Sequence, residues 1–300
     1  MDELLSWIAE LTGAERARRG QRIQSLWGGY GELWRIELRG AATSSAILKW
    51  VEPPPLLPRT ARKSERSHRR KLRSYAVETG FYRSFAPRCD ERCRVPALLG
   101  SRAGSNRWAL LLEDLDAGGF SGRTSRPNGA QLDACLAWLA AFHARFLGVA
   151  PDGLWKTGTY WHLATRPDEL AALADTTLRA GAAEWDRALS ASPFQTLVHG
   201  DAKPANFCFA KRGGGVAAVD FQYVGGGCGM KDVAYLLHGE ASPGRHLDAY
   251  FTHLRSALAS EASKASVESE AVDAAALERD WRALYPIAVS DFSRFLAGWR

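Results

Sequence analysis

The part of the sequence that decides the fold reads LVHGDAKPAN at residues 197–206 and VDFQ at residues 219–222. Phosphoryl transfer requires a carboxylate near the attacking hydroxyl and oxygen ligands that hold magnesium against the phosphates. Asp201 offers such a carboxylate, because it could orient a hydroxyl group and accept its proton. Asn206 and Asp220 carry the hard oxygen donors that suit Mg²⁺. A short loop and a hairpin between these residues would bring them together at one end of a cleft.

The order of these residues resembles the catalytic core of aminoglycoside phosphotransferases, choline kinases and the ecdysteroid-kinase-like family. Residues 220–222 (DFQ) and 74–82 (SYAVETGFY) look most like the ecdysteroid-kinase-like group. The resemblance implies an α+β, protein-kinase-like fold with two lobes. A small antiparallel-sheet lobe that binds nucleotide is expected over residues 1–115, and a larger, mainly helical catalytic and substrate-binding lobe over residues 116–300. A chance His-Gly-Asp loop beside unrelated acidic residues is the alternative.

The resemblance also implies roles for individual residues. ATP and Mg²⁺ would be the cofactors, Asp201 the catalytic base, and Asn206 and Asp220 the metal ligands. His199 would support the catalytic loop rather than take part in the chemistry, and Asp232 would brace the same loop. An aspartate at the start of a helix is the simpler interpretation of Asp232, and the two interpretations are compatible.

A lysine stands within an apolar segment that reads AILKW at residues 46–50. A lysine in an apolar strand costs free energy unless it is paired, so Lys49 is expected to have a partner. The resemblance offers Glu78, on a helix expected over residues 71–85. Lys49 would then contact the α- and β-phosphates of ATP, with Glu78 holding it in place. An edge-strand lysine that reaches solvent is the alternative.

A glycine-rich turn, GGYG at residues 28–31, lies between two expected strands. It would cover the phosphates through Gly29 and Gly31. Trp34 stands where the last glycine of a full glycine-rich loop would be, and a glycine hairpin is the usual explanation of such a turn.

The segment LLLEDL at residues 110–115 resembles the connection between the two lobes. Backbone groups there, including those of Glu113 and Leu115, would bind adenine, so the identity of the side chains is less informative.

Composition limits the class of protein. The net charge of +6 over 300 residues is mild, and the 46% hydrophobic and 24% charged fractions are typical of a globular protein. ATP is itself anionic, so no nucleic-acid partner is required by the charge. No apolar run is long enough for a membrane span, and acidic residues stand where a signal peptide would be basic. Five scattered cysteines do not suggest a disulfide framework. We therefore expect a cytoplasmic protein with no membrane or nucleic-acid partner.

The stretch of residues 59–73 is dense in Arg and Lys. It could bind nucleic acid or a membrane, but it lacks interleaved aromatic residues, which favours a solvated loop and helix face. A flap near the phosphates is a further interpretation.

A protein substrate is not expected. Protein kinases carry a long activation segment and an Ala-Pro-Glu motif after the metal-binding aspartate. Here only residues 221–231 separate Asp220 from Asp232. A catalytically silent ATP-binding regulator is the alternative function, and the intact Lys49, Asp201 and Asn206 argue against it.

The acceptor is expected to be a small, apolar or neutral alcohol that binds in the helical lobe. Aromatic walls suit flat apolar ligands or a quaternary amine, although most such rings belong to a core. Few acidic residues stand nearby to bind a polycation, Asp168, Glu169 and Asp291 being the exceptions. The aromatic residues concerned are Trp155, Tyr160, Trp161, Trp281, Tyr285, Phe292, Phe295 and Trp299.

Overall fold

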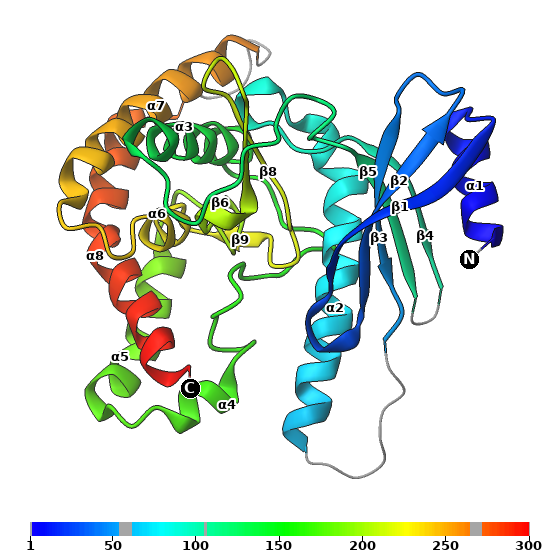
Figure 1. The fold of residues 1–300 in the computed structure, drawn as a ribbon. Helices are drawn as coiled ribbons and strands as arrows, with labels where there is room; N and C mark the ends of the chain where they lie inside the picture. Colours follow the sequence, from blue (N-terminus) through cyan, green and yellow to red (C-terminus); the bar gives the residue numbers. More distant parts are fainter. Residues whose placement is uncertain (1, 54–61, 105–106, 265–271, 300) are drawn as a thin grey trace.

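The computed structural model describes residues 2–53, 62–104, 107–264 and 272–299 (Figure 1). The first part of the chain forms one antiparallel sheet with strand order β1-β2-β3-β5-β4. Helix α1 (Asp2–Thr12) packs on its outer side, and the long helix α2 (Arg62–Ser84) stands between the sheet and the rest of the molecule (Figure 1). The strands are β1 (Arg16–Ser25), β2 (Gly31–Arg39), β3 (Ser45–Val51), β4 (Leu98–Ala103) and β5 (Trp108–Glu113).

Alternation along β3 gives its two faces different environments. Ala46 and Leu48 are fully buried in a cluster that includes Ile8 of α1. Ile47 and Lys49 point to the opposite face, because successive side chains of a strand alternate, and they line the cavity between the sheet and the helical part. Lys49, which the sequence predicted to need a partner, therefore points into the molecule and not to solvent.

The N-terminal helix is shorter than its sequence pattern suggests. Apolar periodicity predicts a helix over residues 4–18, but α1 ends at Thr12 and β1 begins at Arg16. Gly13 adopts a left-handed backbone (φ 66°), which ends the helix. Only Ala17 of β1 is buried, so this polar edge strand lacks the alternation by which strands are recognised.

The second part of the chain is mainly helical. Helix α3 packs against α7, and α5 and α6 pack against α8. Apolar periodicity predicts one helix over residues 169–189, but the structure has two, because Asp175 accepts hydrogen bonds from the amides of Thr177 and Leu178 and begins a new helix. The helices are α3 (Gly129–Arg145), α4 (Pro167–Ala172), α5 (Thr176–Ala191), α6 (Met230–Leu236), α7 (Pro243–Lys264) and α8 (Ala274–Gly298).

Two short antiparallel pairs carry the catalytic-looking sequence. Strand β6 (Thr196–Val198) pairs with β9 (Gly225–Gly227), and β7 (Phe207–Phe209) pairs with β8 (Val216–Ala218). Phe221 follows β8 and stacks on Phe81 of α2 with ring centroids 3.9 Å apart. This contact fixes the segment after β8 against the helix that borders the sheet.

The expected α+β class, with an antiparallel sheet followed by a mainly helical part, is confirmed. The lobe boundary at residue 115 stays a prediction. Over the described ranges, no helix combines the length and apolar character that crossing a bilayer requires. Short 3₁₀ helices occupy Trp27–Gly29, Ala86–Arg88, Glu91–Cys93 and Pro204–Asn206.

Candidate active site

The loop after β6 is held in place by a buried aspartate of α6. Asp232 has no exposed surface, and its carboxylate accepts hydrogen bonds from the amides of His199 (2.6 Å) and Gly200 (2.9 Å). His143 of α3 lies 3.2 Å from the same carboxylate. The contact that the sequence predicted between Asp232 and the catalytic loop is present, and it fixes the backbone just before Asp201.

The glycine and the histidine of the loop have structural reasons to be there. Gly200 has a φ of 80°, and a Cβ atom on it would lie 2.1 Å from the carbonyl oxygen of Tyr223. The ring of His199 makes a hydrogen bond to the carbonyl oxygen of Val219 (3.0 Å) and accepts one from the amide of Asp201 (3.2 Å). His199 therefore connects the loop to the segment that leads to Asp220.

Asp201 and Asn206 lie together at the end of this loop. The Oδ2 of Asp201 accepts hydrogen bonds from Lys203 Nζ (2.8 Å) and Asn206 Nδ2 (2.9 Å). Its Oδ1 is buried and has no hydrogen-bond partner among the described residues. Burial raises the pKa of Asp201 above its ordinary value. Asn206 turns its amide nitrogen toward Asp201, which leaves its oxygen available to a cation.

A second group of charged residues consists of Lys49 on β3, Glu78 on α2 and Asp220 after β8. Lys49 Nζ lies 2.7 and 2.9 Å from the two carboxylate oxygens of Glu78 and 3.5 Å from Oδ1 of Asp220. Burial would lower the pKa of Lys49, but the two carboxylates outweigh it and raise that pKa. Burial opposes ionisation of Asp220, yet the positive charge of Lys49 and its neighbours keeps the pKa of Asp220 below its ordinary value.

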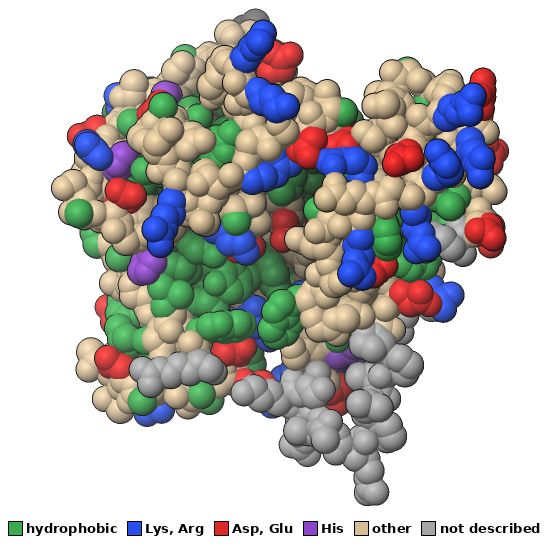
Figure 2. All heavy atoms as spheres, viewed as in Figure 1, with side chains coloured by type: hydrophobic (Ala, Val, Ile, Leu, Met, Phe, Trp, Pro, Cys, Tyr) green, Lys and Arg blue, Asp and Glu red, His purple; other side chains and the backbone are tan. Residues whose placement is uncertain are grey.

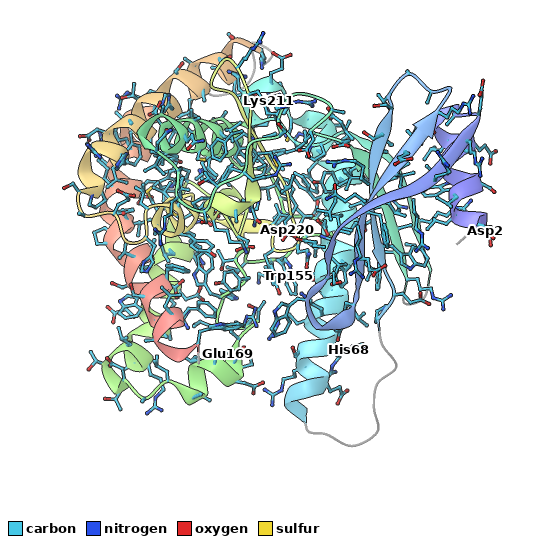
Figure 3. The ribbon with its side chains drawn as sticks, viewed as in Figure 1. Asp2, His68, Trp155, Glu169, Lys211 and Asp220 are labelled. Atoms are coloured by element: carbon cyan, nitrogen blue, oxygen red, sulfur yellow. The ribbon has the colours of Figure 1, made fainter. Side chains whose placement is uncertain are left out.

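A cavity of about 710 Å³ lies between the sheet and the helical part, and Asp220 stands at the junction of the two parts (Figure 3). Lys49, Asn206 and Asp220 line it. The backbone after β5 forms one of its walls, and Glu113 and Leu115 lie there as the sequence predicted. The cavity is large enough for a nucleotide, since ligand pockets are typically about 300–1,000 Å³.

The side chain of Glu113 is directed to the protein. It pairs with Arg94 and accepts a hydrogen bond from the amide of Ala97 (3.0 Å). These contacts hold the end of the segment at residues 110–115, whose backbone the sequence predicted to bind adenine, against the chain that leads into β4. Adenine binding at Glu113 and Leu115 itself stays a prediction.

The glycine-rich turn is placed differently from its expected role. Gly28 lines a second cavity, whereas Gly29 and Gly31 are not part of the lining of either cavity. A Cβ atom on Gly31 would lie 2.0 Å from the carbonyl oxygen of Trp50, so the close pairing of β2 with β3 explains that glycine. Phosphate binding by Gly29 and Gly31 stays a prediction, and Gly28 is the glycine that faces a ligand space.

The second cavity, of about 360 Å³, begins where the first one ends. Asp220, Gln222, Gln24 and Leu26 line both cavities, and Asp201 lines the second. Hydrophobic side chains gather in the hollow between the two parts of the molecule (Figure 2). The lining that sequence analysis did not assign to the site includes Trp27, Tyr30, Arg70, Lys71, Tyr75, Arg166, Lys203 and Tyr223.

The arrangement fits a magnesium nucleotide. Asn206 presents an amide oxygen, and Asp220 is kept ionised by its neighbours. These are the oxygen donors that Mg²⁺ takes in phosphoryl-transfer sites. The backbone of Asp220 is in the left-handed region (φ 69°), which is uncommon for a residue other than glycine and is frequent at functional sites.

Comparison with known families supports this interpretation. The model of a phosphotransferase enzyme family, APH, matches residues 23–264. The chain belongs to this family. The match confirms the resemblance to aminoglycoside phosphotransferases, and it makes this APH-family protein a small-molecule kinase. No curated protein matches the chain.

Solved structures similar to this APH-family protein include three kinases. An amicoumacin kinase in complex with AMP-PNP, Ca²⁺ and Ami shares 14% identity over 88% of each chain, with a TM-score of 0.47. A putative fructosamine-3-kinase from Haemophilus somnus shares 13% identity over 99% of this chain and 91% of that one, with a TM-score of 0.45. An aminoglycoside phosphotransferase from Streptomyces rimosus in complex with ADP and streptomycin shares 16% identity over 96% and 99%, with a TM-score of 0.43.

Proposed function

We propose that this small-molecule kinase transfers the γ-phosphate of ATP to a hydroxyl group of a small acceptor, with magnesium as cofactor. The observation that carries the proposal is the position of Asp201. It lies in the lining of the second cavity, next to Asp220, where that cavity meets the one lined by Lys49. A carboxylate at the junction of a nucleotide cavity and an acceptor cavity is where phosphoryl transfer requires one.

Each charged residue then has a defined task. Lys49, held by Glu78, binds the α- and β-phosphates, while Asn206 and Asp220 provide the oxygen ligands of the metal. Magnesium, when bound, neutralises charge on the phosphates. Asp201 orients the acceptor hydroxyl and accepts its proton. The acceptor oxygen forms a bond to the γ-phosphorus, the bond from that phosphorus to the β–γ bridging oxygen breaks, and ADP leaves with the electron pair.

Aromatic side chains support a flat acceptor, as expected from the sequence. Of the rings named there, Tyr160 and Trp299 line the second cavity. Trp161 and Trp281 are fully buried and belong to the core. An apolar or neutral alcohol would pack against these aromatic rings. It would not explain why Arg70, Lys71 and Arg166 line the same cavity.

The basic stretch expected to be solvated also has a defined place. Its residues from Arg62 onward form the first half of α2, and residues 59–61 lie outside the described residues. Arg70 and Lys71 line the second cavity, which favours a role in binding a small ligand over binding of nucleic acid. A cytoplasmic location stays a prediction.

Turnover with a panel of alcohols tests the proposal. ADP formation is measured with ATP, magnesium and hydroxyl compounds of different size and charge, and phosphorylated product is identified by mass spectrometry. Asp201→Asn is expected to bind ATP like the parent protein and to lose turnover by about 10²-fold or more. ATP binding without acceptor-dependent ADP formation across the panel would instead indicate a catalytically silent regulator.

A further inference from the structure

Three basic side chains meet at the second cavity. Arg70 and Lys71 come from α2, and Arg166 comes from the loop before α4. Arg70 donates a hydrogen bond to the carbonyl oxygen of Thr165 (2.7 Å), which brings α2 to that loop. We call Arg70, Lys71 and Arg166 the cation cluster. Because like charges repel, each of them disfavours the charged form of the others, and this contributes to the lowered pKa values of Lys71 and Arg166 after burial itself.

Within the described part of the chain, Lys71 forms no ion pair. Among the described residues, its ammonium has no carboxylate within 4.0 Å and makes no hydrogen bond, and its nearest aromatic contacts are the rings of Trp27 and Tyr75 at 5.9 and 5.8 Å. Arg70 likewise has no carboxylate partner; it contacts only Thr165 and Ser67. Asp220 attracts Lys71 from a longer distance. A partly buried cation that no carboxylate of the described residues contacts is still unfavourable, which points to an anion that the ligand brings.

The acidic residues that the sequence offered for binding a polycation each form an ion pair with an arginine. Asp168 lies 3.2 Å from Arg66, Glu169 lies 3.2 Å from Arg166, and Asp291 lies 2.8 Å from Arg294. These three carboxylates are the ones that could have bound a polycation. The only carboxylates in the lining are Asp201 and Asp220, which the phosphoryl-transfer chemistry uses. Among the described residues that line this cavity, a cationic acceptor therefore finds no carboxylate other than these two.

Exposed aromatic rings stand around the same space. Trp27 is 78% exposed and Trp299 is 45% exposed, although large apolar side chains are normally covered. Both line the second cavity together with Tyr160. Arg166 lies over the ring of Trp299, 4.7 Å from its centroid. The space thus offers flat apolar walls beside a group of cations.

We propose that the acceptor is an anionic alcohol: a hydroxyl compound with a flat apolar body and a carboxylate or phosphate group that the cation cluster binds. The proposal rests on the proposed kinase function and replaces a neutral acceptor by an acidic one. The anion pairs with Lys71 and Arg70, the apolar body lies between Trp27 and Trp299, and the hydroxyl reaches Asp201.

The nucleotide does not account for the cation cluster. Arg70, Lys71 and Arg166 are absent from the lining of the larger cavity, which contains Lys49 and Asn206. The triphosphate has Lys49 and the metal as counter-charges at that end. The cluster lies on the other side of Asp220, and a second anion is the ligand that matches its position and charge.

Four matched probes test the charge of the acceptor: para-hydroxymethylbenzoate, para-hydroxymethylphenyl phosphate, the neutral para-hydroxymethylbenzamide and the cationic para-hydroxymethylbenzylamine. Binding is measured calorimetrically on the full chain with a non-hydrolysable ATP analogue and magnesium, and turnover is measured with ATP. At least one anionic probe is expected to bind about tenfold more tightly than the amide, since charge-assisted hydrogen bonds are the stronger ones. The two anionic arms distinguish a carboxylate from a phosphate.

Single-residue variants test whether the cation cluster is the part of the protein that binds the anionic group of the probe. Lys71→Gln, which removes no hydrogen bond within the described structure, is expected to weaken binding of the preferred anionic probe about tenfold and to leave KM for ATP within about twofold. Arg70→Gln is expected to act in the same direction. Arg69→Gln is the matched control, because the side chain of Arg69 is exposed and pairs only with Glu65 (3.4 Å).

Three results would overturn the proposal: no binding of either anionic probe at millimolar concentration, equal or tighter binding of the amide or the amine, and a rise in KM for ATP in Lys71→Gln without any change for the anionic probe. These outcomes leave the kinase assignment standing if other alcohols support ADP formation. Asp201→Asn separates the two questions, since it should abolish turnover and retain the preference for the anionic probe.

Discussion

Asparagine at position 232 would remove the charge that the amides of His199 and Gly200 share. Asp232 is fully buried, and its two oxygens each accept one of these hydrogen bonds at 2.6 and 2.9 Å. Asn has one acceptor oxygen, so one of the two amides loses its partner and faces an NH₂ group instead. His143 adds a third contact, at 3.2 Å, that depends on the carboxylate.

The loss of stability expected for Asp232→Asn follows from these contacts. A hydrogen bond to a charged group contributes about 1.5–3 kcal/mol, and a buried amide left without a partner costs about as much. We therefore expect Asp232→Asn to lower the free energy of unfolding by about 3 kcal/mol. For a chain of this size the melting temperature should fall by about 6 °C. Since the amides precede Asp201 directly, a displacement of about 1 Å should lower kcat about 10²-fold.

Thermal denaturation and steady-state turnover, measured well below the melting transition, test both numbers. Asp248→Asn is the control, because Asp248 is an exposed aspartate whose contact is an ion pair with Arg282 (2.9 Å). The control should resemble the parent protein in both measurements. If Asp232→Asn keeps kcat within about threefold while its melting temperature falls, the aspartate stabilises the fold without positioning the catalytic loop, and the reasoning fails.

Three further outcomes are expected. Burial raises the pKa of Asp201 above its ordinary 3.8, and the ionised form accepts the proton, so kcat should rise with pH through that raised value; a kcat that is flat from pH 4 to pH 7, or that falls with pH there, would contradict this. Asp220→Ala should weaken binding of magnesium–ATP more than binding of metal-free ATP in calorimetric titrations, and equal losses would exclude Asp220 as a ligand. Lys49→Met leaves Glu78 buried without its cation and should destabilise the protein by about 3 kcal/mol. Adding Glu78→Leu should restore most of that stability but not the activity, and a further loss in the double variant would refute the pairing.

Local sequence was sufficient for the catalytic loop. Gly200, Asp201 and Asn206 are close in the chain, so their spacing alone predicts that they share one loop. The pairing of Lys49 with Glu78 spans 29 positions. The apolar strand predicted that Lys49 has a partner, and the family resemblance identified that partner as Glu78.

The cation cluster could not be predicted in the same way. Its basic residues look like the solvated face of a helix until α2 meets the loop before α4, and Arg70 lies 95 positions from its partner Thr165. The close approach of Gly31 to Trp50 could not be predicted either, since it depends on strand pairing. The sequence predicted a strand over residues 22–27, but the first residues of β1 were assigned to the preceding helix, because an exposed edge strand has no buried face to impose alternation.

Helix α2 joins the two ends of the site. Lys71, at the proposed acceptor anion, and Glu78, which pairs with Lys49 at the proposed phosphate site, lie about 10 Å apart along one helix axis. An acceptor that steadies this helix also steadies the nucleotide, and coupling of this kind is reciprocal, so each ligand tightens the other by the same factor. The two substrates should then bind synergistically. If so, the nucleotide would be held less firmly beside Asp201 when no acceptor is bound, and less phosphate would be transferred to water.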